Sequence, residues 1–258
     1  MEDYRERDIM ISTRELKEIA KRSGLTLYQQ EKDYLLKLFL FYYYRMFEDA
    51  IFKGGTCIKY IYGLERFSED IDFNLRGSPK KFQRQVEKIV KKIEDLGMES
   101  KFRKQKLFTE SFTCEINFKG PLFMGKDYSM NKFRIDAGKR TGTILKPKWQ
   151  VIESEYPETG KSFLVLTMDE KEILAEKIVA MLSRGRGRDL YDVWFLLKRG
   201  VEVDEELVEK KCSTELGRVP SRREYENDIK NLVYVKVPYE QVIKEIKEKL
   251  SGTRLNIK

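Results

Sequence analysis

Histidine is missing from the 258-residue chain. Its absence excludes a Ser-His or Cys-His catalytic pair, a histidine general base and a zinc site with histidine ligands. If the chain is an enzyme, its chemistry must therefore come from carboxylates, lysines, arginines and a bound metal.

Cysteine is scarce, and long apolar runs do not occur. Cys57, Cys114 and Cys212 are scattered, odd in number and without metal-ligand spacing, so we expect reduced thiols in a cytoplasmic protein. No apolar run of about 18 residues is present. The charged N-terminus has no signal-peptide core, and we expect no membrane partner.

Positive charge is in excess. The 51 lysines and arginines against 43 acidic residues give a net charge of +8. This balance favours anionic partners such as RNA or nucleotides, although a merely lysine-rich surface explains the charge alone equally well. The length allows one large domain or two lobes.

A glycine-rich turn lies near residue 54. Residues 51–53 have the pattern of a strand end, Gly54 and Gly55 allow a tight turn, and Thr56 opens a predicted helix through Leu64. Backbone N–H groups in such a turn can face an anion, and the N-terminus of the helix adds a favourable field for phosphate.

Two aspartates follow on a predicted strand, Asp70–Leu75. Asp70 and Asp72 are two residues apart, so their carboxylates project from the same face. A pair of hard oxygen ligands suits Mg²⁺ carrying a nucleoside triphosphate. The alternative is a charged strand edge beside an ordinary turn, but the two motifs occurring in order favour the nucleotide site.

The Gly-Gly-Thr turn and residues 66–73, RFSEDIDF, resemble the first motif of the DNA polymerase β-like nucleotidyltransferases. More narrowly, they resemble the AbiEii/AbiGii toxin family of abortive-infection and toxin–antitoxin systems. The resemblance covers most of residues 12–200. It implies an α+β fold, with a polymerase β-like core of mixed sheet flanked by helices, and a C-terminal helical lobe.

The remaining pattern predicts further elements and three regions. Helices are expected over 12–23, 28–48 and 79–96, strands over 101–107, 112–118 and 132–137, and an irregular connection over 141–162. The chain turns helical beyond Thr167, which opens a capping-box match. The expected regions are N-terminal helices packing on the core (1–50), the nucleotidyltransferase core (51–166) and the helical lobe (167–258).

The resemblance also implies a third carboxylate on a later strand beside Asp70 and Asp72. Asp136 matches it in order and apolar context, with Glu115 as the competing candidate. Asp70, Asp72 and Asp136 are thus the expected catalytic and metal residues, holding two Mg²⁺ ions or Mn²⁺ in their place.

A second group lies in the helical part. Lys177 sits among apolar residues, where it could contact a triphosphate or simply extend to solvent. Residues 184–188, RGRGR, carry three arginines, which could contact phosphate or RNA or could form the cap of a helix. The family resemblance favours a functional role for these residues. It links Lys177 to nucleotide binding and Asp189 to activity, and it links Asp192 to activity less firmly.

The expected function is a metal-dependent nucleotidyltransferase that moves an NMP from an NTP to an acceptor hydroxyl. The resemblance implies the 3′ end of RNA, in particular tRNA, as acceptor and an antitoxin encoded nearby. Gly54, Gly55, Thr56, Lys177 and Arg188 are the expected nucleotide-binding residues. A GTP- or ATP-binding defence or regulatory module without transfer activity is the alternative.

Overall fold

The computed structural model describes residues 10–139, 142–212, 217–233 and 235–254. The chain forms two compact units, each assembled from several segments. The sheet unit comprises Met1–Phe52, Glu69–Arg140 and Trp149–Leu166, and the helical unit comprises Lys53–Ser68, Thr141–Lys148 and Thr167–Lys258. The domain boundaries expected from the sequence stay a prediction.

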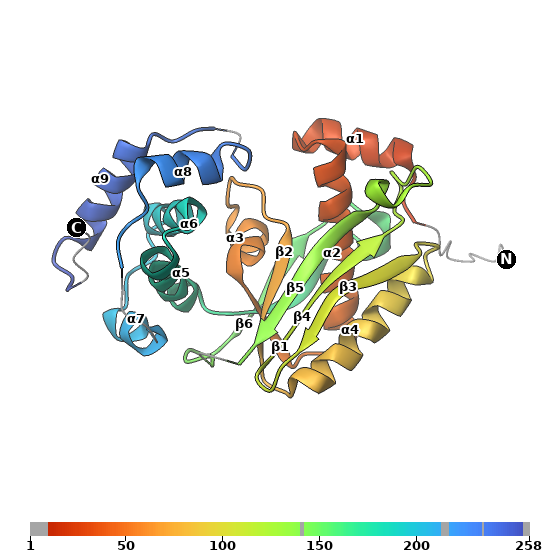
Figure 1. The fold of residues 1–258 in the computed structure, drawn as a ribbon, viewed down its shortest axis with the longest axis horizontal. Coiled ribbons are helices and arrows are strands. Elements are labelled where there is room, and N and C mark those ends of the chain that lie inside the picture. The colour runs from red at the N-terminus through yellow and green to blue at the C-terminus, as the bar shows by residue number, and fades with distance from the viewer. Residues whose placement is uncertain (1–9, 140–141, 213–216, 234, 255–258) are drawn as a thin grey trace. The chain divides into compact units, whose positions relative to one another are not determined.

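A mixed seven-stranded sheet has the order β3-β4-β5-β2-β1-β7-β6 (Figure 1). The strands are β1 (Ala50–Lys53), β2 (Asp70–Leu75), β3 (Ser100–Leu107), β4 (Ser111–Phe118), β5 (Asn131–Gly138), β6 (Lys148–Glu153) and β7 (Ser162–Thr167). β2 is parallel to β5, whereas β3, β4 and β5 are antiparallel neighbours. With helices packed against it, this sheet confirms the α+β class.

Helices α2 and α4 cover one face of the sheet. The helices of this unit are α1 (Thr13–Ser23), α2 (Leu27–Met46), α4 (Pro79–Glu94) and the short 3-10 turns η1 (Asp127–Ser129) and η2 (Pro157–Thr159). Phe39 of α2 packs edge-on against Phe133, and Phe82 of α4 against Phe73. Because side chains alternate along a strand, the residues next to Phe73 on β2 and next to Phe133 on β5 face the other side of the sheet.

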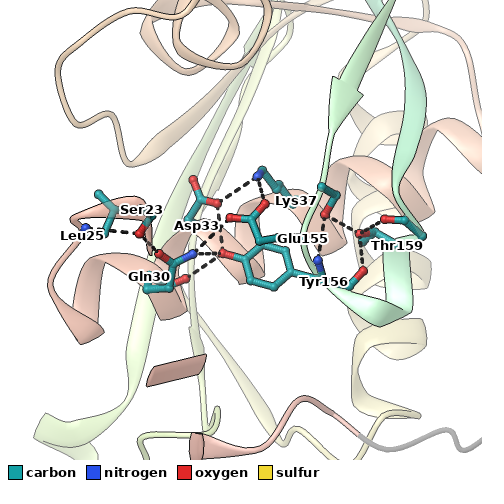
Figure 2. A network of polar contacts seen from close by, with 10 residues as sticks. Ser23, Leu25, Gln30, Asp33, Lys37, Glu155, Tyr156 and Thr159 are labelled. Carbon is teal, nitrogen blue, oxygen red and sulfur yellow. Dashed lines mark hydrogen bonds and ion pairs between the residues drawn. The ribbon is translucent and has the colours of Figure 1, made fainter. Parts of the chain in front are cut away.

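A buried polar network fastens α2 to the segment around η2 (Figure 2). The Lys37 ammonium lies 2.7 Å from Glu155 and 3.3 Å from Asp33, whose carboxylate also accepts the Tyr156 hydroxyl. Burial would lower the pKa of Lys37, but the two carboxylates outweigh it and hold that pKa above its ordinary value. The lysine is therefore a paired structural charge.

The helical unit contains α3 (Gly54–Tyr62), α5 (Glu170–Arg184), α6 (Gly187–Lys198), α7 (Glu205–Lys211), α8 (Arg222–Ile229) and α9 (Tyr239–Leu250). α5 packs on α6 and α7, and α6 packs on α8 and α9. A Cβ added at Gly187 would lie 2.4 Å from the Tyr225 Cα, so α6 and α8 approach closely only because this residue is glycine. No helix in the described ranges is long and apolar enough to cross a membrane.

Several predicted boundaries were wrong. α3 begins at Gly54 rather than Thr56, because extended Lys53 takes the N-cap position and both glycines enter the first turn. The connection 141–162 contains β6 and η2, whose pattern was obscured by flanking prolines. α5 is capped by Asp169, which accepts the Lys171 N–H, and not by Thr167.

Candidate functional site

The three expected metal ligands share one face of the sheet. Asp72 of β2 lies directly opposite Asp136 of β5 in the parallel register, and Asp70 lies opposite Arg134. Ile71 and Ile135, one position away, are buried on the face that α2 and α4 cover. The carboxylates therefore project from the opposite face, with Asp72 and Asp136 on adjacent strands about 4.8 Å apart.

The register also separates the two candidates for the third carboxylate. Asp136 is on the strand next to β2, and its side chain is 46% exposed. Glu115 is one strand further away and contacts Lys132 at 3.4 Å and Lys104 at 3.6 Å. The strand arrangement thus favours Asp136 as the partner of Asp72.

The donor chemistry of this face fits Mg²⁺, which prefers carboxylate and water oxygens. The Asp136 carboxylate accepts a hydrogen bond from Arg134 at 2.9 Å. Within the described residues, no three cysteine or acidic side chains are already grouped closely enough to hold an ion. A divalent ion would accordingly draw Asp136 away from Arg134.

The Gly-Gly-Thr turn forms the first turn of α3 in the helical unit. No side-chain cap bonds its N-terminus, and the Thr56 hydroxyl donates to Ser68 at 3.0 Å. A Cβ added at Gly55 would lie 2.5 Å from Nη2 of Arg66. The glycine thus lets the backbone of this turn pass directly against a guanidinium group.

Arg66 lies beside this turn and was not among the residues expected to form the site. Its side chain is 4% exposed and donates through Nε and Nη2 to the two carboxylate oxygens of Asp192, at 2.6 and 2.7 Å. Its Nη1 donates to the Phe67 carbonyl at 3.0 Å. Its place in RFSEDIDF was the available signal, but its partner is 126 residues away.

Lys177 joins the same cluster from α5. Its ammonium lies 2.7 Å from Asp192 and 3.1 Å from Asp189. Burial would lower the pKa of Lys177, yet the two carboxylates raise it above its ordinary value. Burial would raise the pKa of Asp192, yet Arg66 and Lys177 hold it below its ordinary value.

We call Arg66, Lys177, Asp189 and Asp192 the buried ionic cluster. It contains two cations and two carboxylates, so its formal charge is balanced. Oδ2 of Asp189 is buried and has no hydrogen-bond partner among the residues that the structure describes, and the Arg184 guanidinium approaches it only to 4.0 Å. In this arrangement Lys177 is held by carboxylates, so contact with phosphate would require an exchange of partners.

The arginine run spans the end of α5 and the start of α6. Gly185 ends α5 in a left-handed conformation, and Gly187 already begins α6 and donates its N–H to Asp228 at 2.8 Å. Arg188 is exposed on the first turn of α6. The buried Asp189 follows it and points into the cluster.

A second ion-pair chain lies next to Lys177 and was also missed. Lys53, the N-cap residue of α3, lies 2.9 Å from Glu176. Glu176 contacts Lys211, which in turn lies 2.6 Å from Glu172. Glu172 accepts the N–H groups of residues 144 and 145. This chain connects the start of α3 to α5 and α7.

Comparison with known proteins identifies the family. The sequence model described as "Nucleotidyl transferase AbiEii toxin, Type IV TA system" matches residues 40–251. An uncharacterised protein from Aquifex aeolicus is 27% identical over 207 residues, which are 77% of this chain and 79% of that one.

Solved structures share the fold. MenT4, a nucleotidyltransferase toxin from Mycobacterium tuberculosis H37Rv, aligns with a TM-score of 0.63 and 17% identity, covering 95% of this chain and 91% of that chain. JHP933 from Helicobacter pylori aligns with a TM-score of 0.62 and 15% identity, covering 88% and 92%. The family match spans most of the chain, and the chain therefore belongs to the AbiEii family of nucleotidyltransferase toxins.

Proposed function

We propose that this nucleotidyltransferase moves an NMP from an NTP to the 3′-terminal hydroxyl of RNA, in particular tRNA, in a reaction that depends on a divalent metal. The observation that supports the metal is the register pair of Asp72 and Asp136 on the face opposite to α2 and α4. The net charge of +8 supports a polyanionic acceptor. An antitoxin encoded nearby is the proposed partner, in line with the family description.

The roles follow from donor chemistry. Asp70, Asp72 and Asp136 are the proposed ligands of Mg²⁺, or of Mn²⁺ in its place. A bound ion would polarise the α-phosphate and stabilise the charge on the attacking and leaving oxygens. Asp136 would also accept the proton of the acceptor hydroxyl.

The triphosphate is assigned to the start of α3. The N–H groups of Gly54, Gly55 and Thr56 belong to an N-terminus without a side-chain cap, where the helix dipole favours phosphate. Lys177 would add a positive charge once a phosphate competes with its carboxylate partners. Asp189 keeps that lysine in place, and exposed Arg188 is the proposed outer contact.

Transfer of α-phosphate label from each of the four NTPs to total tRNA tests the proposal, with wild type beside Asp72→Ala and with EDTA as a metal control. We expect label in RNA that disappears in the variant and in EDTA. Label that survives both treatments would overturn metal dependence. NTP binding without label in RNA would overturn the RNA acceptor.

A further inference from the structure

The edge strand β3 is strongly basic. It carries Lys101, Arg103, Lys104 and Lys106 and no acidic residue over Ser100–Leu107. All four basic side chains are exposed. Lysine on an edge strand discourages pairing between copies, but the strand register gives these side chains a more specific position.

The register extends from this strand to the proposed catalytic carboxylates. Lys106 lies opposite Thr113 of β4, and Thr113 lies opposite Asp136 of β5. Asp136 in turn lies opposite Asp72 of β2. Residues opposite each other in a sheet project from the same face. Lys106 therefore shares the face of Asp72, three strands or about 14 Å away.

A second row repeats the arrangement. Arg103 lies opposite Glu115, Glu115 opposite Arg134, and Arg134 opposite Asp70. Lys101 precedes Arg103 by two residues, so it faces the same way. We call Lys101, Arg103 and Lys106 the β3 basic row. They line the β3 edge of the sheet face that also carries Asp70, Asp72 and Asp136.

The acidic neighbours of this row are already neutralised by other residues. Glu115 contacts Lys132 at 3.4 Å and Lys104 at 3.6 Å, and Asp136 contacts Arg134 at 2.9 Å. Among the described residues, the β3 basic row makes one ion pair, from Arg103 to exposed Asp127 at 3.7 Å. Its positive charge is thus largely uncompensated.

We propose that the β3 basic row binds the phosphates of the acceptor RNA just before its 3′ end and directs the terminal hydroxyl toward Asp72 and Asp136. This inference rests on the proposed function and adds the binding surface to it. Because the register shifts between Arg103 and Lys106, Lys101 and Lys106 pair with Asn117 and Thr113, which are four residues apart, or about 13 Å along the strand. A row of that length matches an extended polyanion better than a single triphosphate.

Two matched triple variants test the surface. The test variant is Lys101→Ala/Arg103→Ala/Lys106→Ala. The control is Lys80→Ala/Arg84→Ala/Lys88→Ala, which removes the same charge from the exposed side of α4, on the layer that covers the other face. Binding of a 5′-labelled RNA hairpin with a single-stranded 3′ tail is measured against salt concentration, together with NTP binding and thermal unfolding.

We expect the test variant to bind the RNA about tenfold or more weakly, with the salt slope reduced by about 2 for three lost phosphate contacts. NTP binding and the unfolding temperature should match the wild type, and the control should retain RNA affinity. Equal losses in both variants, no loss in the test variant, or a wild type that does not bind the RNA would each overturn the surface.

The same proteins distinguish this inference from the proposed function. If the wild type binds RNA through the β3 basic row but transfers no label to it, RNA as the acceptor is wrong while the surface stands. If label transfer persists unchanged in the test variant, transfer to RNA stands and the surface is wrong.

Discussion

The two groups of charged residues that this chain offers for catalysis differ in burial and in balance. In the buried ionic cluster, Asp192 is fully buried and forms ion pairs with Arg66 and Lys177. On the sheet, Asp136 is 46% exposed and has an arginine partner that is itself 54% exposed. A ligand can displace the second kind of contact at little cost, whereas breaking the first leaves charge buried and unpaired.

This difference predicts a division of labour. Asp136 can change partners at little cost, as a proposed metal ligand must. The buried ionic cluster fixes the relation between the Gly-Gly turn, α5 and α6, and its charges are used to hold one another. Mutations in the two groups should therefore separate activity from stability.

Asp72→Asn should have the largest effect on activity. Loss of one metal-directed carboxylate removes several kcal/mol of transition-state stabilisation, so label transfer should fall about 10³-fold. The free energy of unfolding should fall by no more than about 1 kcal/mol, because Asp72 is only partly buried. Parallel activity and urea-unfolding measurements check both, and a strongly destabilised variant would break the comparison.

Asp192→Ala should have the largest effect on stability. It leaves Arg66 and Lys177 without their shared carboxylate, and we expect a loss of about 3–5 kcal/mol in unfolding free energy. The double variant Arg66→Met/Asp192→Leu removes one positive and one negative charge together, so no arginine is left unpaired, and it should recover most of that loss. Equal destabilisation of the single and double variants would show that the charges are not what matters.

Gly55→Ala tests how closely the Gly-Gly-Thr turn packs against Arg66. Alanine in a helix normally gains up to about 1 kcal/mol over glycine, but here its Cβ would meet the Arg66 guanidinium at 2.5 Å. Because Asp192 and the Phe67 carbonyl hold that group, we expect a net loss of about 1–3 kcal/mol instead. Gly138→Ala, whose Cβ would make ordinary contacts at 3.5 and 3.6 Å, is the control and should change stability little. A stabilised Gly55→Ala would mean that Arg66 moves freely.

The smallest expected effect is on pH dependence. The pKa values of Asp192 and Glu176 are lowered in the folded state, because nearby cations outweigh the effect of burial. Their stabilisation is present above about pH 4 and is lost as the pH falls through the folded pKa values. Arg66→Met/Asp192→Leu should therefore lose less stability than wild type between about pH 4 and pH 2 in acid titrations followed by circular dichroism. Parallel curves would contradict the assignment.

Local patterns predicted much of the fold. The strand with Asp70 and Asp72 was predicted because alternation and a motif coincide within a few residues. The helix ending at Ser23 was predicted from its capping box, in which Ser12 and Glu15 bond each other's backbone. Such features depend on neighbours along the chain.

Long-range features could not be predicted in the same way. The pairing of Arg66 with Asp192 joins residues far apart in sequence, and no local periodicity encodes it. The strand register that sets Asp136 beside Asp72 is equally non-local; the sequence supplied Asp136 only through the family resemblance. The β3 basic row likewise became visible only once four strands were aligned.

Binding of Mn²⁺, followed by electron paramagnetic resonance in the presence of a non-hydrolysable NTP, shows whether Asp72 and Asp136 hold a metal ion. We expect binding to wild type and to Asp189→Asn, with affinity at least about tenfold weaker in Asp72→Asn and in Asp136→Asn. Unchanged Mn²⁺ affinity in both sheet variants, or loss only in Asp189→Asn, would contradict a metal site at Asp72 and Asp136.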